Sequence, residues 1–245
     1  MDRLMIPWEK SKGNGKGADA YGKENCYLKR KSEEKREHLG FNGEKIHIKE
    51  RQVCKMKKNL GVVQAVYPMP VLIVAAYDES GKVNAMNAAW GMICNEDRIA
   101  LFIDEDHKTT QNILKTKAFT VSLADRDHMD VADFFGIATG NKMDDKFERT
   151  GYTAVKSEFV NAPVIEEFPV VMECELAEVS ETESFYCIVG RIVNTAAEEK
   201  VLSENGKVDP AKLQALIFDQ FQHGYYVSGE QVGKAWNAGA GLMKK

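Results

Sequence analysis

The sequence predicts a mainly β fold, an antiparallel barrel that is closed or partly closed and carries short flanking helices. Over residues 60–245 the predicted strands outnumber the predicted helices, and the two do not alternate regularly. A doubly wound parallel sheet would require that alternation. Residues 71–89 also have the pattern of a hairpin, the usual connection between antiparallel strands, which favours the barrel.

Runs of β-favouring residues and alternation of apolar with polar positions identify the strands. Residues 71–77 are apolar, residues 78–81 form a hairpin-type turn, and residues 83–89 return. Residues 98–104 form another short apolar run. Apolar residues alternate with Thr and Ser in residues 119–123 and with Glu in residues 172–176, which predicts one buried and one polar face. Residues 185–193 are apolar at both alternating positions, so this strand is expected to be buried on both sides.

The predicted helices are few and short. They cover residues 110–116, 128–137, 144–149 and 210–217. Asp209 is the expected N-cap of the last one, and Gly151 follows the third. His223, Tyr225 and Tyr226, near the carboxyl end, are expected to cover one end of the barrel rather than reach a pocket mouth.

Charge divides the chain into two parts. Residues 1–55 hold 14 Lys and Arg against 9 Asp and Glu and show no sustained period, so we expect a disordered or misassigned N-terminal extension. Residues 56–245 hold the other 19 basic and 28 acidic groups and form the expected domain. Glycine patterns at residues 13–18 and 17–23 resemble nucleotide-binding loops, but no predicted strand precedes them and we reject both.

Several classes of protein are disfavoured. The acidic balance of residues 56–245 repels nucleic acid, and no apolar run has the length of a membrane helix. Because the amino terminus also lacks an apolar stretch preceded by basic residues, we expect a cytoplasmic protein. The five cysteines show no Cys-x-x-Cys pair and no zinc-finger spacing, so we expect reduced thiols. Hydrolytic and zinc motifs are absent from the sequence, so no hydrolytic site and no metal site are predicted.

Three stretches have the residue types of a cofactor site. Residues 84–91 combine small side chains and two Asn with Trp90, which lets a planar ring approach the backbone; the alternative is a barrel corner with Trp90 in the core. Residues 106–110 place Lys108 and two threonines before a helix, as a phosphate site does; the alternative is an ordinary threonine cap with exposed neighbours. Residues 139–147 either add a lysine to that site or form a solvated loop and a capped helix.

The order of these stretches resembles the flavin reductase-like, flavoredoxin-type family of FMN-binding split barrels, over nearly all of residues 60–240. The segments that carry the resemblance are NAMNAAW, HKTTQNI, FTVSLA, ADFFGIATGNKMDDKF, APVIEEFPVVMECEL and GRIVN. The resemblance implies an FMN-binding split β-barrel, a Greek-key antiparallel barrel with short flanking helices. It also implies a homodimer whose subunits jointly frame the pocket.

By position, the resemblance also implies which residues bind FMN. Contacts with the isoalloxazine and ribityl chain fall on Asn84, Met86, Asn87, Ala88, Ala89 and Trp90. Contacts at the phosphate end fall on Lys108, Thr109, Thr110, Thr139, Gly140 and Lys142. The chain departs from many relatives at His107, where they carry Arg, and at Asn87, where they carry Thr. These departures bear on phosphate affinity and on flavin potential.

The implied activity is flavin-dependent oxidoreduction, in which NADH or NADPH delivers hydride to flavin N5 and the electrons pass to a second flavin or a small acceptor. The alternative is a non-enzymatic flavoredoxin-type electron carrier that a redox partner protein reduces. A third possibility is a flavin-free oligomeric barrel that serves as an interaction module. The sequence does not separate these three functions.

Overall fold

The computed structural model describes residues 38–39, 45–46 and 57–243, and the chain divides into two units between Val63 and Gln64. In the first unit, β1 (His38–Leu39) and β2 (Lys45–Ile46) pair as antiparallel strands. The rest of the predicted extension, with the rejected glycine patterns, lies outside the described residues. That prediction therefore stays a prediction.

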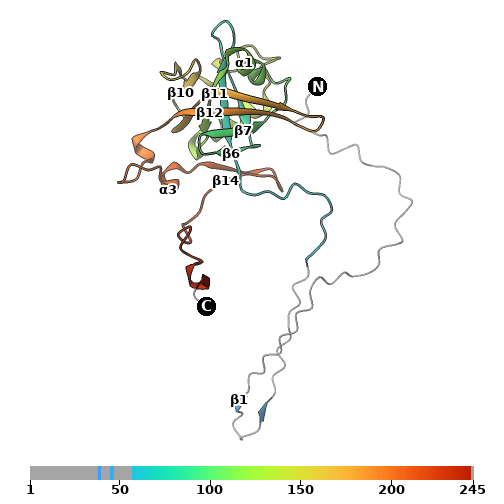
Figure 1. Ribbon diagram of the computed structural model, residues 1–245, viewed down its shortest axis with the longest axis vertical. Coiled ribbons are helices and arrows are strands. Elements are labelled where there is room, and N and C mark those ends of the chain that lie inside the picture. Colours follow the sequence, from blue (N-terminus) through green and yellow to red (C-terminus); the bar gives the residue numbers. More distant parts are fainter. Residues whose placement is uncertain (1–37, 40–44, 47–56, 244–245) are drawn as a thin grey trace, which may run out of the picture. The chain divides into compact units, whose positions relative to one another are not determined.

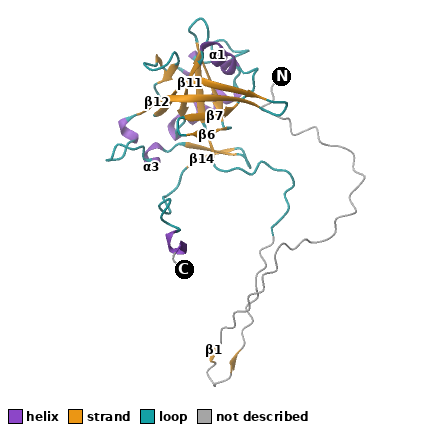
Figure 2. Ribbon diagram, in the orientation of Figure 1, coloured by secondary structure: helices purple, strands orange, loops and turns teal. Residues whose placement is uncertain are grey.

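A seven-stranded sheet forms the body of the second unit (Figures 1 and 2). Its strands are β4 (Leu72–Tyr77), β5 (Val83–Ala88), β6 (Gly91–Asn95), β7 (Arg98–Phe102), β8 (Ala118–Leu123), β11 (Val170–Glu181) and β12 (Tyr186–Ala197). The order is β5-β4-β8-β11-β12-β7-β6, and all pairs are antiparallel. Because β5 and β6 follow each other in sequence yet lie at opposite edges, the ladder of this sheet is open between them. The predicted antiparallel barrel is confirmed.

Smaller elements surround this sheet, and Figure 2 shows the helices as short peripheral pieces. The outer strands are β3 (Met69–Pro70), β13 (Leu216–Asp219) and β14 (Gly224–Val227), which form one sheet, and the pair β9 (Ala154–Lys156) and β10 (Pro163–Ile165). The α-helices are α1 (Lys108–Thr116), α2 (Met129–Ile137) and α3 (Pro210–Leu213). The 3-10 helices are η2 (Arg126–His128), η3 (Glu148–Thr150), η4 (Glu199–Val201) and η5 (Ala240–Met243). No helix in these described ranges has the length and hydropathy needed to cross a bilayer.

Two hydrophobic cores lie on opposite faces of β4 and β5. The first fills the barrel and includes Leu72, Val74, Met86, Leu101, Ile113 and Phe119. The second lies between the sheet and α2 and includes Ile73, Ala75, Ala85, Phe135, Phe147 and Leu216. Because side chains alternate along a strand, consecutive residues of β5 pack into different cores.

The second core corrects the prediction of a polar outer face on β8. Thr120 and Ser122 are buried, and Thr120 Oγ1 donates to the carbonyl oxygen of Pro163 at 2.6 Å. Glu173 of β11 is also buried, where its carboxylate accepts hydrogen bonds from Ser157 Oγ and Asn194 Nδ2. A second layer thus covers this face, and its backbone and hydroxyl groups satisfy the polar residues.

Two helix predictions are wrong in extent. Residues 144–147 form turns, and helical structure appears only as η3. The predicted helix 210–217 is α3, a single turn capped by Asp209 as expected, and Gln214 ends it in a left-handed conformation. Residues 216–219 then form β13, because apolar side chains here pack into the second core instead of continuing a helical face.

A buried lysine, Lys146, connects the turns that follow α2 to the end of that helix. Lys146 is 3% exposed, and its Nζ donates to the carbonyl oxygen of Phe135 at 2.9 Å. The ammonium group lies 5.7 Å from the centroid of the Phe135 ring. This contact places a cation at the carboxyl end of α2, the end that favours positive charge. Burial nevertheless lowers the pKa of Lys146 from 10.5 to about 8.

Replacing Lys146 by Met should make stability depend less on pH. Between about pH 8 and pH 10.5 the unfolded chain holds the lysine proton and the folded chain releases it, so wild-type stability rises with pH across this window. The rise attributable to Lys146 is at most about 3 kcal/mol. Urea unfolding at the two ends of the window should show a smaller rise for Lys146→Met, whereas Lys156→Met, at an exposed lysine, should behave like wild type. An equal rise in all three proteins would contradict the shifted pKa.

Candidate functional site

The free side of β5 carries the first predicted stretch. β5 pairs with β4 on one side only, so the N–H and C=O groups along its other edge have no strand partner in the described sheet. The chain leaves this edge through Ala89 and Trp90 before β6 begins at Gly91. An edge of this kind leaves main-chain groups available to a ligand.

Side chains of the same stretch point to both faces of the sheet. Met86 and Ala88 belong to the barrel core, and Ala85 belongs to the second core. Asn84 therefore shares its face with Met86, while Asn87 lies on the face toward α2. A ligand along this edge meets backbone flanked by two different sets of side chains.

Asn84 joins all three predicted stretches. Its buried side chain donates from Nδ2 to Thr109 Oγ1 at 2.6 Å. A Cβ on Gly140 would overlap Asn84 Oδ1 and would lie 3.2 Å from the Cβ of Lys108. Because only glycine permits this approach, β5, the start of α1 and the turn at Gly140 meet at one point.

Polar groups at the amino end of α1 are arranged as in an anion site. The N-cap residue is His107, whose side chain makes no capping hydrogen bond. Thr110 is fully buried, and its Oγ1 has no hydrogen-bond partner in the structure. Lys108, the first helical residue, is half-buried. Uncapped N–H groups, a buried hydroxyl and an ammonium group suit a phosphate, and the alternative of a threonine cap with exposed neighbours is wrong.

The turn after α2 lies against this helix start. Thr139 accepts hydrogen bonds from Lys142 N at 3.1 Å and, at Oγ1, from Asn141 N at 3.3 Å. Asn141 Nδ2 donates to the carbonyl oxygen of Asp106 at 2.7 Å, which ties the turn to the loop before α1. Lys142 is exposed on the same turn. Its predicted role at a phosphate stays a prediction.

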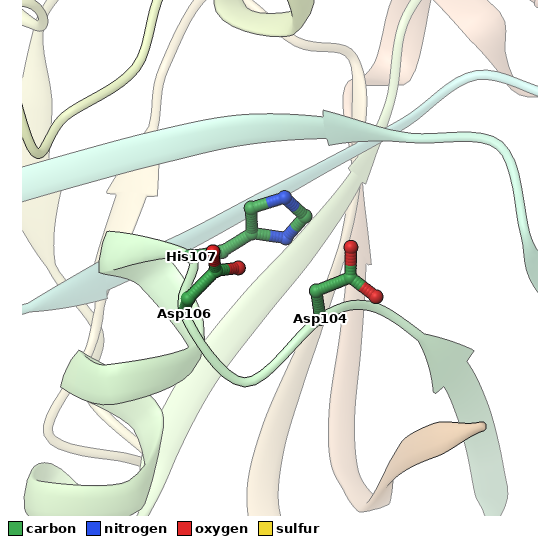
Figure 3. Close-up of side chains that lie close together, drawn as sticks. All are labelled: Asp104, Asp106 and His107. Carbon is green, nitrogen blue, oxygen red and sulfur yellow. The ribbon is translucent and has the colours of Figure 1, made fainter. Parts of the chain in front are cut away.

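Acidic side chains lie beside the same helix start (Figure 3). One ligand atom from each of Asp104, Asp106 and His107 lies within 4.8 Å of the others, and His107 Nδ1 is buried without a hydrogen-bond partner. Both carboxylates are exposed, and exposed acidic groups of this kind are common without a metal. Their electrostatic consequence is clear: an anion at the start of α1 is attracted by Lys108 and repelled by two aspartates.

At the other end of the stretch, Trp90 is 50% exposed, so the alternative that places it in the core is wrong. The carbonyl oxygen of Trp90 accepts from Phe102 N at 2.8 Å, which holds the Ala89–Trp90 link against β7. Asn84 and Ala88 are four residues apart on β5, about 13 Å along the strand. The edge is therefore long enough for a ligand with a phosphate at one end and a ring at the other.

The contacts of Asn87 were not anticipated from the sequence. Asn87 Nδ2 donates to the carbonyl oxygen of Ala132 on α2 at 3.0 Å. Tyr225 of β14 donates to Asp133 Oδ1, also on α2, at 2.9 Å and packs against the second core. No motif marks these residues, because β5, α2 and β14 become neighbours only in the folded chain.

Comparison with known proteins identifies the same architecture. The Flavin reductase like domain matches residues 64–221. Flavoredoxin of Desulfovibrio vulgaris (Miyazaki F) is 35% identical, with a TM-score of 0.71, and the similarity covers 75% of this chain and 100% of the flavoredoxin. Flavoredoxin from Methanosarcina acetivorans is 28% identical, with a TM-score of 0.68 and coverage of 77% and 99%.

A protein with a split-barrel domain from Shewanella frigidimarina shares the fold at 17% identity. Its TM-score is 0.62, and the similarity covers 69% of this chain and 86% of that protein. The domain match spans most of the described barrel, including β5, α1 and the turn at Gly140. The chain therefore belongs to the flavin reductase-like family of split-barrel proteins.

Proposed function

We propose that the chain binds FMN along the free edge of β5, with the phosphate at the start of α1. The observation that carries this proposal is the meeting of Asn84, Thr109 and Gly140 beside the unpartnered hydroxyl of Thr110. Family membership and the similarity to two flavoredoxins support a flavin as the ligand. The residues present fit the group, because an uncapped helix start meets the needs of a single phosphate.

The residues divide by the part of FMN that they would hold. At the phosphate end these are Lys108, Thr109, Thr110, Thr139, Gly140 and Lys142. Along the ribityl chain and ring they are Asn84, Met86, Asn87, Ala88, Ala89 and Trp90. Asn84 fixes the position of Thr109 through its hydrogen bond, while Asp104 and Asp106 oppose Lys108 and lower the affinity for phosphate.

Flavin reductase-like membership supports an oxidoreductase that takes hydride from NADH or NADPH and reduces a flavin or a small acceptor. When bound, the flavin supplies this redox chemistry, so no catalytic side chain is required. The half-exposed Trp90 gives the ring end of the edge an apolar surface on which a nicotinamide can pack.

A second candidate is an electron carrier that a redox partner protein reduces. The 35% identity to a flavoredoxin over 75% of the chain favours it specifically. For either function we propose a cytoplasmic protein, and the free state of the three cysteines in the described residues (Cys94, Cys174 and Cys187) is consistent with a reducing compartment.

We also propose that the protein is a homodimer that pairs through the outer face of β6 and β7. Met92 on β6 is 65% exposed, and Phe102 on β7 is 41% exposed. Phe185 packs edge-to-face against Phe102, with ring centroids 5.8 Å apart. Together with Trp90 these side chains form an exposed apolar surface next to the proposed ring site, as expected of a subunit interface.

Gly140→Ala should weaken FMN binding by about tenfold or more, equivalent to about 1.4 kcal/mol, because the new Cβ displaces Asn84 from Thr109. Riboflavin, which lacks the phosphate, should lose less affinity. Fluorescence titration with both flavins measures this difference. Gly229→Ala is the matched control, since a Cβ there meets nothing within 4 Å. Unchanged FMN affinity in Gly140→Ala would rule out the phosphate site.

Mixing the FMN-loaded protein with NADH or NADPH under anaerobic conditions separates the two functions. Bleaching of the flavin absorbance within seconds, with turnover when a flavin or small acceptor is added, is the result expected of the reductase. Reduction only in the presence of a partner reductase would support the carrier instead. A colourless protein that FMN neither binds nor stabilises against heat would contradict both.

Met92→Glu should convert a dimer into a monomer, because a charge would be buried at the interface. Light scattering coupled to gel filtration reports the mass. Met129→Glu is the matched control, since Met129 is 45% exposed on α2, away from β6 and β7. A monomeric wild type, or a Met92→Glu variant that stays dimeric, would exclude this interface.

A further inference from the structure

A cavity of about 510 Å³ lies where η2, η4 and α3 meet, and it shares no residue with the proposed FMN site. Hydrogen bonds join its walls: Arg126 N donates to the carbonyl oxygen of Gln214 at 3.1 Å, and Lys212 Nζ donates to that of Leu202 at 2.6 Å. Sites for small molecules and cofactors have volumes of about 300–1,000 Å³. The cavity is therefore large enough for a ligand, and contacts within the chain hold its shape.

The floor of the cavity is apolar. Val201 is 2% exposed and Leu213 is 7% exposed, and both belong to a small hydrophobic core with Val170. A planar ring that packs on these side chains removes apolar surface from water. Because an inorganic anion would leave this surface uncovered, the ligand that fits carries an apolar ring.

Three cationic side chains line the same cavity, one from each segment. They are Arg126, Lys200 and Lys212. Lys200 Nζ also lies 2.8 Å from the carboxylate of Glu198. The side chain of Arg126 makes no hydrogen bond or ion pair with another residue that the structure describes, so its guanidinium N–H groups are available to a ligand. A guanidinium group pairs with phosphate through parallel hydrogen bonds.

Two carboxylates line the cavity as well. Asp125 is 7% exposed, and its Oδ1 lies 2.5 Å from His128 Nδ1, which fixes the carboxylate in place. Asp127 is exposed. Because carboxylates accept hydrogen bonds and repel anions, a ligand that fits must also offer hydrogen-bond donors. Ribose hydroxyls, which lie between a ring and a phosphate, meet this requirement.

We propose that this cavity binds a nucleoside phosphate. The base packs on the apolar floor, the ribose hydroxyls donate to Asp125 and Asp127, and the phosphate pairs with Arg126. Two sources share this chemistry: the adenylate half of a nicotinamide nucleotide, and a free nucleotide.

The first source rests on the proposed function, and strand register supports it. Leu72 pairs with Ala88 of β5 and with Leu123 of β8. Adjacent strands lie about 4.8 Å apart, so Ala88 and Leu123 are about 10 Å apart. Asp125 follows Leu123 by two residues. The cavity therefore lies at the same end of the sheet as the proposed ring site, within reach of the far half of a dinucleotide.

Calorimetric titration of the full chain with adenosine 5′-monophosphate (AMP) and with adenosine tests this proposal. Excess FMN is present throughout, so that AMP does not occupy the start of α1. Arg126→Gln should weaken AMP binding about tenfold and leave adenosine binding unchanged, because only the phosphate loses a partner. Asp127→Asn should weaken both ligands by a similar factor, because the ribose loses a charged acceptor. Arg149→Gln is the matched control, since Arg149 bonds to Asp145 on another segment, and it should equal wild type.

A titration of AMP in the presence of NADP⁺ distinguishes the two sources. Competition between them supports the adenylate half, and independent binding supports a free nucleotide. Undetectable AMP binding to wild type, or equal AMP affinity in wild type and Arg126→Gln, would overturn the inference. If Arg126→Gln does not fold, Asp127→Asn decides in the same way. FMN binding is measured separately, so failure of the proposed function would be recognised on its own.

Discussion

The rest of the site depends on how β5 is packed. Both faces of this strand are covered by hydrophobic cores, while one of its edges has no strand partner in the described sheet. Met86 faces the barrel core and Ala85 faces the second core, so the strand is held between two packed layers. The chain then restarts as β6 at the opposite edge of the sheet, which leaves the ladder open. Rigid packing on both faces lets an unpaired edge persist beside a ligand without fraying.

The two asparagines of β5 form hydrogen bonds with helices that lie outside the sheet. Asn84, on the barrel side, reaches Thr109 at the start of α1 and leaves room only for glycine at position 140. Asn87, on the opposite side, is held by its hydrogen bond to the Ala132 carbonyl of α2. In the proposed FMN site, Asn84 lies at the phosphate end and Asn87 lies along the ring, so substitutions at the two positions should affect different parts of the ligand.

Local patterns predicted most of the fold but failed where long-range contacts competed with them. The hairpin of β4 and β5 and the start of α3 at Asp209 depend on neighbouring residues, and both predictions are confirmed. The helix expected after Pro210 stops at Leu213, because the second core takes Leu216 into a strand. Thr120 looked solvent-facing in sequence, yet a second layer covers it and its hydroxyl bonds to Pro163.

By itself the sequence determined the antiparallel β class, the small-residue stretch at residues 84–90 and a helix that begins near Thr110, because these depend on propensities and spacing within a few residues. Only the tertiary structure decided that Asn84 meets Thr109 and Gly140, that Trp90 is half-exposed and that Asn87 bonds to the Ala132 carbonyl of α2. The physical reason is that a hydrogen bond or a close approach depends on distance in space. Strand order and the layer formed by α2 set those distances, and no local pattern in the sequence encodes them.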